Sequence, residues 1–193
     1  MSFFEESIKG LNSIKMMLGT ALKYKEQTPK LKGELFMKAY ENGVLVHDYH
    51  KSNIIVNTAS ILIARLLKDN TEPTKGISYL AVGSGASGWN PFDPPAPTTS
   101  QTLLESEFER KAIELTTFVN PETGEPTTVD TNIVDYSVTF GEAEAVGPIM
   151  EMSLFGGDAT SERNTGTMVN WRTFPVINKT NSMTLTIIFR ITS

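Results

Sequence analysis

The sequence predicts a mainly β protein: an antiparallel β-sandwich of about eight strands, with an N-terminal amphipathic helix and one short internal helix. The clearest sign is the C-terminal run, in which every second residue from Met183 to Ile191 is apolar, with Ile188 as the one exception to the alternation. Such a period of two is typical of a strand with one buried face. Alternation recurs over 134–140, and Asn42-Gly43 between two apolar-rich runs predicts a tight hairpin.

The first predicted element is an amphipathic helix over residues 2–25. Ser2 and Glu5 match a capping box, and the lysines lie off the apolar stripe. The stripe recurs at spacings of three or four, and its members are interface candidates: Phe4, Ile8, Leu11, Ile14 and Leu18. We expect the helix to dock on its own domain or on a neighbouring subunit. A membrane-surface helix is the alternative, but a dense basic face is lacking.

The rest of the chain supplies the strands and the second helix. We divide the sequence into an N-terminal helix and linker over 1–32 and a β-sandwich domain over 33–193. Asn57 can cap a helix from Thr58 to Lys68. The expected strands are 34–40, 44–50, 77–82, 108–119, 134–140, 149–155, 167–174 and 183–192.

A long loop is expected over residues 83–99. Its start, Gly83 to Gly88, matches the G-x-G-x-x-G spacing of dinucleotide sites, but the prolines that follow prevent the helix that such a site needs. The loop also carries two large aromatic residues, Trp89 and Phe92, which we take as candidates for an intersubunit contact. The alternative for Trp89 is that it packs back onto its own domain.

Composition argues against several classes of function. The chain has 193 residues, no cysteine and only two histidines, His47 and His50, which a strand would point to opposite faces. Glu142 and Glu144 could form a carboxylate pair, but a solvated strand end is the simpler interpretation. We therefore predict that the protein is not an enzyme, with no catalytic, cofactor-binding or metal-binding residues and no cofactor.

Charge and hydropathy limit the expected partners. The net charge is −5, and the lysines of the N-terminal part are dispersed rather than clustered. Nucleic acid affinity depends on grouped cations, so no nucleic acid partner is expected. No apolar run approaches the ~20 residues of a membrane span, so no membrane partner is expected. A secretory signal is not expected either, because Glu5 and Glu6 stand where a basic region would be.

Four sequence pieces follow one another in the C-terminal third of the chain: a strand with an acidic-Gly turn, a strand containing E-x-x-L-F, a G-T-M run ending in F-P-x-I-x-K, and a Thr-rich closing strand, at 136–145, 149–155, 166–179 and 185–191. Together with the earlier segments 53–67 and 79–85, these pieces resemble small virion structural proteins of tailed bacteriophages and related prophages. The resemblance covers about residues 33–193, and the helix over 2–25 departs from it.

This resemblance implies a structural subunit at the neck or collar, the tail or the site of fibre attachment. The subunit would assemble in the bacterial host cytoplasm and reside in the virion, with other virion proteins and copies of itself as partners. The alternative function is a host-surface or carbohydrate-binding module of a tail fibre or baseplate, in which Trp89 and Phe92 contact the ligand.

Overall fold

The computed structural model describes residues 30–68 and 75–193. Residues Leu31–Ser193 form one compact unit, to which the description below refers. The predicted helix over 2–25 lies outside the described residues. So do its interface candidates, Phe4, Ile8, Leu11, Ile14 and Leu18.

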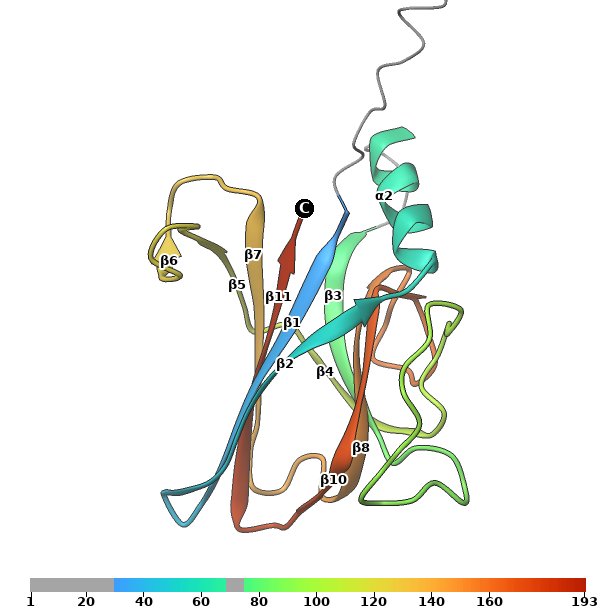
Figure 1. The fold of residues 1–193 in the computed structure, drawn as a ribbon, viewed down its shortest axis with the longest axis vertical. Coiled ribbons are helices and arrows are strands. Elements are labelled where there is room, and N and C mark those ends of the chain that lie inside the picture. Colours follow the sequence, from blue (N-terminus) through green and yellow to red (C-terminus); the bar gives the residue numbers. More distant parts are fainter. Residues whose placement is uncertain (1–29, 69–74) are drawn as a thin grey trace, which may run out of the picture. The chain divides into compact units, whose positions relative to one another are not determined.

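The described unit is mainly β and antiparallel, as the sequence predicted, with one short helix (Figure 1). Helix α2 spans Thr58–Lys68, the bounds expected from the sequence. The strands are β1 (Lys32–Glu41), β2 (Val44–Ile55), β3 (Lys75–Gly83), β4 (Glu107–Ala112), β5 (Leu115–Val119), β6 (Pro126–Thr127), β7 (Ile133–Phe140), β8 (Gly147–Gly157), β9 (Thr167–Met168), β10 (Asn170–Lys179) and β11 (Met183–Thr192).

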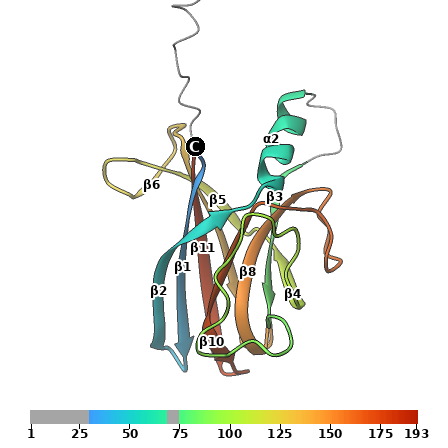
Figure 2. The ribbon, with the colours of Figure 1, turned by 45° about the vertical axis from the view of Figure 1, so that its right-hand side comes forward.

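The strands form a single sheet in the order β4-β3-β8-β10-β2-β1-β11-β7-β5-β6, with β9 paired to β8. Strand β2 connects the two halves of this sheet, because it pairs with β1 up to Asn53 and then with β10 through Ile54 and Ile55. The two halves face each other (Figures 1 and 2). One buried apolar cluster joins residues of both halves, including Leu35 and Phe189 from one and Leu80 and Met152 from the other.

Strand β11 confirms the alternation seen in the sequence. Met183, Leu185, Ile187 and Phe189 are buried, whereas the residues between them are partly exposed. Strand β11 lies between β1 and β7, and Ile187 pairs with Val138 of β7. The C-terminal strand is therefore central in its half of the sheet.

The Asn42-Gly43 hairpin is also confirmed. Both residues have positive φ values, 50° for Asn42 and 78° for Gly43, and they connect β1 directly to β2. Positive φ at both central positions is the requirement of a type I′ turn, whose twist matches that of the flanking strands.

The described residues form eleven strands instead of the expected eight, because two predicted strands are each broken in two and the short strand β6 was not predicted. The run 108–119 divides where Ile113 N donates to Ser78 O on β3, and Glu114 N then donates to Ser137 O on β7. This short break carries the chain from one half of the sheet to the other. The run 167–174 divides into β9 and β10, and β10 continues beyond Pro175 with a register shift against β8.

Strand β8 is buried on both faces from Ile149 to Gly157. Its inner face contributes to the main core. Its outer face lies under residues 84–106, which we call the covering segment. A second apolar cluster forms there, with Trp89 packed against it. Its buried members are Val56, Ala81, Leu104, Phe155, Met168 and Trp171.

Candidate functional site

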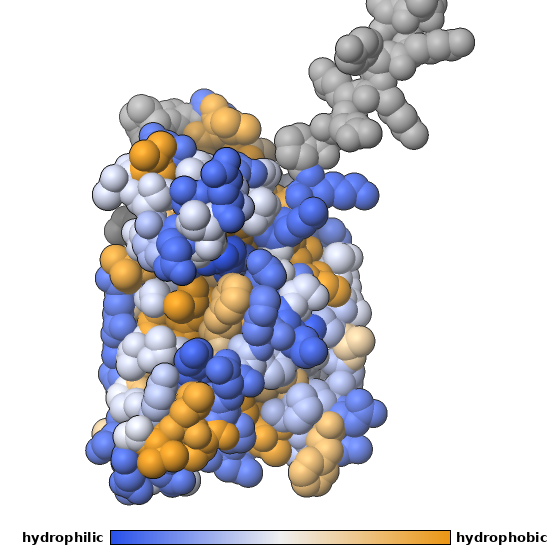
Figure 3. All heavy atoms as spheres, turned by 60° about the vertical axis from the view of Figure 1, so that its left-hand side comes forward, coloured by the Kyte–Doolittle hydropathy of each residue, from blue (hydrophilic) through white to orange (hydrophobic). Residues whose placement is uncertain are grey.

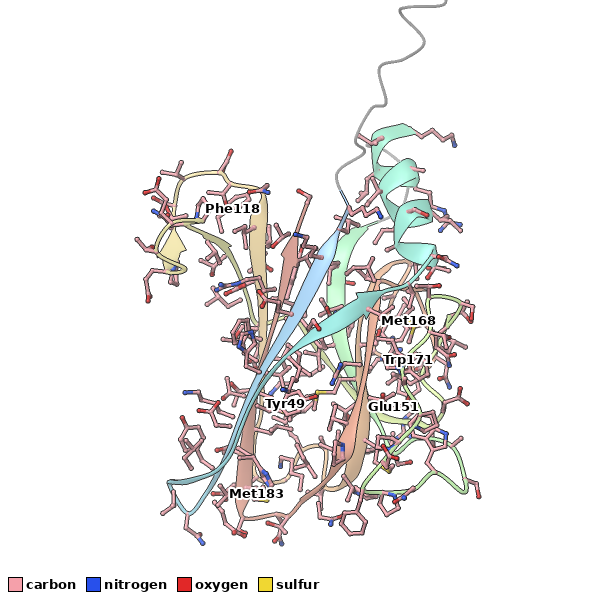
Figure 4. The ribbon with its side chains drawn as sticks, in the orientation of Figure 1. Tyr49, Phe118, Glu151, Met168, Trp171 and Met183 are labelled. Carbon is pink, nitrogen blue, oxygen red and sulfur yellow. The ribbon has the colours of Figure 1, made fainter. Side chains whose placement is uncertain are left out.

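The carboxylate of Glu151 lies at the base of the covering segment. Glu151 is fully buried, and its Oε1 accepts hydrogen bonds from Gly85 N at 3.2 Å and Ser106 N at 3.0 Å. Its Oε2 accepts a hydrogen bond from Trp171 Nε1 at 3.0 Å. Figure 4 shows Glu151 next to Trp171 on the side of the sheet that the segment covers. Burial raises the pKa of Glu151, while the N–H donors oppose this rise.

These contacts explain the glycine motif that resembles a dinucleotide site. A Cβ atom at Gly83 would collide with the Glu151 side chain, so glycine is needed for the close approach. Gly85 has a φ of 72°, which directs its N–H to the carboxylate. The loop that could have bound a phosphate is instead bonded to an internal anion.

Trp89 packs onto its own domain, which was the alternative interpretation from the sequence. Its ring lies 6.3 Å from that of Trp171 between centroids, at an angle of 45°. Phe92, by contrast, is 79% exposed. The two aromatic residues of this loop therefore differ in burial: Trp89 is partly buried against Trp171, and Phe92 is exposed.

We expect these two residues to differ in their contribution to stability. Trp89→Ser should lower the free energy of unfolding by about 2–3 kcal/mol, somewhat below the range for a fully buried tryptophan. Phe92→Ser should change it by less than about 0.5 kcal/mol, because little of the ring is removed from water. Urea denaturation of the two variants measures both values. Equal effects would contradict the different burial of the two rings.

A second buried ionic cluster fixes the loop between β8 and β9. Arg110 and Glu107 form a buried pair, in which Arg110 Nη2 donates to Glu107 Oε2 at 2.8 Å. Arg110 Nη1 also donates to Thr160 O and Thr165 O, and Glu107 Oε2 accepts from Asn164 N. Both charges are thus bonded within the chain, and they hold a loop in place.

Glu142 and Glu144, which the sequence left as a possible carboxylate pair, have different surroundings. Glu142 is exposed, whereas Glu144 accepts hydrogen bonds from Gly141 N and Lys111 Nζ, both at 2.7 Å. The Lys111 ammonium lowers the pKa of Glu144. Lys179 is buried and donates to Gly141 O at 2.7 Å, and burial lowers its pKa. These groups clamp the turn between β7 and β8.

The two histidines have different surroundings. His50 stacks on Phe36 with ring centroids 4.0 Å apart, and its Nε2 lies 3.0 Å from Glu34 Oε1. His47 is exposed. Within residues 30–68 and 75–193, no group of three or more His, Asp or Glu side chains could hold a metal ion. In the same ranges, no helix is long and apolar enough to cross a membrane.

An apolar pocket of about 350 Å³ lies beside α2. Ile63 and Leu66 of the helix form part of one wall, and Val134 and Ile191 of the facing strands contribute to another. Tyr136 adds the one ionisable side chain of the lining, and burial raises the pKa of its phenol. The hydroxyl is therefore uncharged at neutral pH.

Apolar residues also lie on the surface of α2. Ile61, Leu66 and Leu67 are 51%, 44% and 82% exposed. Figure 3 shows another face of the unit, where apolar side chains form small separate patches among polar ones. At this end of the unit, exposed apolar residues of one helix lie next to an apolar pocket.

The sequence contained signals for both sites. Glu151 is the single charged residue within an apolar run, which suggests that a buried partner is required. The helix over 58–68 has apolar residues around most of its circumference, more than one buried stripe requires. The partners themselves come from distant segments, so spacing could not reveal them.

Comparison with known proteins adds no relative. No protein-family model matches the chain, and no curated protein matches its sequence.

Proposed function

We propose that this protein is a structural subunit of a tailed bacteriophage particle, at the neck or collar, the tail or the site of fibre attachment. It would act through protein–protein assembly with copies of itself and other virion proteins, in the host cytoplasm during assembly and then in the virion. The proposal rests on the sequence resemblance over about residues 33–193 and on the distribution of polar and apolar groups described above.

One observation carries the proposal. The buried charged groups at Glu107, Arg110, Glu151 and Lys179 are bonded to other parts of the same chain. Their hydrogen bonds hold loops, so these four charged groups are occupied within the chain. The apolar surface of α2 and its pocket, by contrast, lack a partner in the described unit, which favours association over catalysis.

We also propose that the antiparallel sheet is a β-sandwich, with β2 passing from one layer to the other. The main core lies between the two halves of the sheet and supports this description. A rigid sandwich with firmly held loops suits a particle subunit. The alternative of a carbohydrate-binding module has less support, because the ring of Trp89 packs against Trp171 rather than standing free as a platform for a sugar.

Deleting residues 1–27 tests the proposal. The shortened chain should retain a β circular dichroism spectrum and a similar thermal midpoint, because the described core lies within Leu31–Ser193. It should remain monomeric in sedimentation velocity under conditions in which the full chain associates, since the predicted apolar stripe is lost. Incorporation of the two chains into particles would then be compared by electron microscopy of labelled subunits.

A control of equal length separates the stripe from the mere presence of the segment. Lys9→Ser with Lys15→Ser and Lys23→Ser changes residues off the stripe and should leave association unchanged. Ile8→Ser with Ile14→Ser and Leu18→Ser should abolish it. Normal incorporation of the truncated chain would contradict the assembly role of the segment.

A further inference from the structure

The lining of the pocket beside α2 is suited to binding a row of apolar side chains. Of its polar lining residues, Asn132 and Ser193 are bonded to each other: Asn132 Nδ2 donates to Ser193 O at 2.6 Å, and Ser193 N donates to Asn132 O at 3.0 Å. They offer little to a charged or strongly polar ligand. The occupant is therefore expected to be apolar.

The shape of the site favours a helix over a small ligand. At about 350 Å³, the pocket lies at the lower end of the range for small-molecule sites. Its rim is open, because Ile63 and Leu66 line it and are still 39% and 44% exposed. An open apolar groove of this kind fits the face of an amphipathic helix, which inserts residues at spacings of three, four and seven.

The chain itself contains a segment with that spacing. The predicted helix over 2–25 has an apolar stripe that includes Ile8, Leu11, Ile14 and Leu18. The described chain begins at Lys30, and the next residue, Leu31, already lines the pocket. Every copy thus carries both the pocket and the predicted apolar stripe, and the first residue of the described unit, Leu31, belongs to the pocket lining.

We propose that the pocket of one copy receives the apolar stripe of residues 2–25 from a neighbouring copy. The inference rests on the proposed function, since it identifies how the subunit would assemble. Residues 26–30 are five residues and span at most about 17 Å when extended. A helix of 24 residues is about 36 Å long, so a helix leaving from the rim would carry most of its stripe beyond its own pocket.

Such a contact has a defined consequence for assembly. The donor surface, residues 2–25, differs from the acceptor surface, the pocket beside α2. A contact between two different surfaces is heterologous, and it generates a ring if the rotation closes or a helical array if it does not. Both are repeated arrangements in which each copy is donor and acceptor at once.

Paired substitutions on α2 in the full chain test the pocket. Ile63→Glu places a charge at the pocket rim. Ile61→Glu places the same charge on the same helix outside the pocket, at similar exposure, 51% against 39%. We expect Ile63→Glu to weaken self-association at least tenfold in sedimentation equilibrium, and Ile61→Glu to change it less than threefold. Equal effects of the two substitutions would overturn the assignment of the pocket.

Crosslinking then identifies the occupant. Because the chain has no native cysteine, a thiol reagent reacts only with the cysteines that are introduced. Chains carrying Ile14→Cys are mixed with chains carrying Leu66→Cys, and a short bifunctional thiol reagent is added. Crosslinked heterodimers are expected, with Leu11→Cys and Leu18→Cys examined in the same way. Lys15→Cys, off the stripe, and Arg65→Cys, outside the pocket lining, serve as matched controls and should crosslink much less.

The outcomes separate this inference from the proposed function. A full chain that is monomeric at all concentrations would overturn both. A chain that associates without a crosslink between stripe and pocket would overturn the inference alone. A chain that carries both Ile14→Cys and Leu66→Cys and gives only an internal crosslink would also overturn the inference alone. The pocket would then bind the stripe of its own chain.

Discussion

Phe189→Ala is expected to lower the free energy of unfolding by about 3–5 kcal/mol, the usual range for a buried phenylalanine. Phe189 is fully buried in the central strand β11, where it pairs with Leu35 of β1 and Tyr136 of β7. Removing the ring leaves a cavity that three strands border and that the sheet cannot easily close. Urea denaturation measures the loss as a lower midpoint with an unchanged m value.

The adjacent residue supplies the control. Ile188 lies on the other face of β11 and is partly exposed, so Ile188→Ala should cost about 1 kcal/mol or less. This residue is the one exception to the alternation in the sequence, and its position on the outer face agrees with the period of two. A loss below about 1 kcal/mol for Phe189→Ala would contradict the burial of the ring.

Sequence patterns correctly predicted the elements whose conformation depends mainly on residues nearby in the sequence. The alternation over 183–192 identified the buried face of β11, because a strand places successive side chains on opposite sides. Asn42-Gly43 identified the hairpin, because both residues tolerate the positive φ of the turn. Helix α2 was also found with its bounds.

Long-range features escaped prediction for a common physical reason. A long loop was expected over residues 83–99, but not that hydrogen bonds to a distant strand would hold it, such as Val176 N to Pro91 O and Thr173 Oγ1 to Pro95 O, both at 2.7 Å. Its glycines and prolines describe the local backbone and carry no information about the surface on which the segment lies. The positions of Trp89 and Glu151 depend on that surface.

Glu151→Leu is the substitution expected to affect the covering segment most. It removes the acceptor of three buried N–H groups, on Gly85, Ser106 and Trp171. Each unsatisfied buried donor costs about 1–3 kcal/mol, and the added apolar burial offsets part of this. We expect a loss of about 3–5 kcal/mol in the free energy of unfolding, together with faster amide hydrogen exchange over residues 84–106.

Glu142→Leu is the matched control, because it makes the same chemical change at an exposed position. It should alter the free energy of unfolding by less than about 0.5 kcal/mol. If Glu151→Leu behaved like Glu142→Leu, the carboxylate could not be the anchor of the covering segment, and the hydrogen bonds of Gly85 and Ser106 would contribute little to the fold.

The pH dependence of stability tests the balance of forces on Glu151. Burial raises its pKa in the folded state above the ordinary value of 4.5. The folded protein therefore holds the proton more tightly than the unfolded chain. This contribution is fully present below pH about 4.5 and is lost as the pH rises through the folded pKa. The difference in free energy of unfolding between wild type and Glu151→Gln should therefore fall as the pH rises from about 4.5 through the folded pKa of Glu151. A relative rise would mean that the three N–H donors outweigh burial, so that the ionised carboxylate is the form that the fold stabilises.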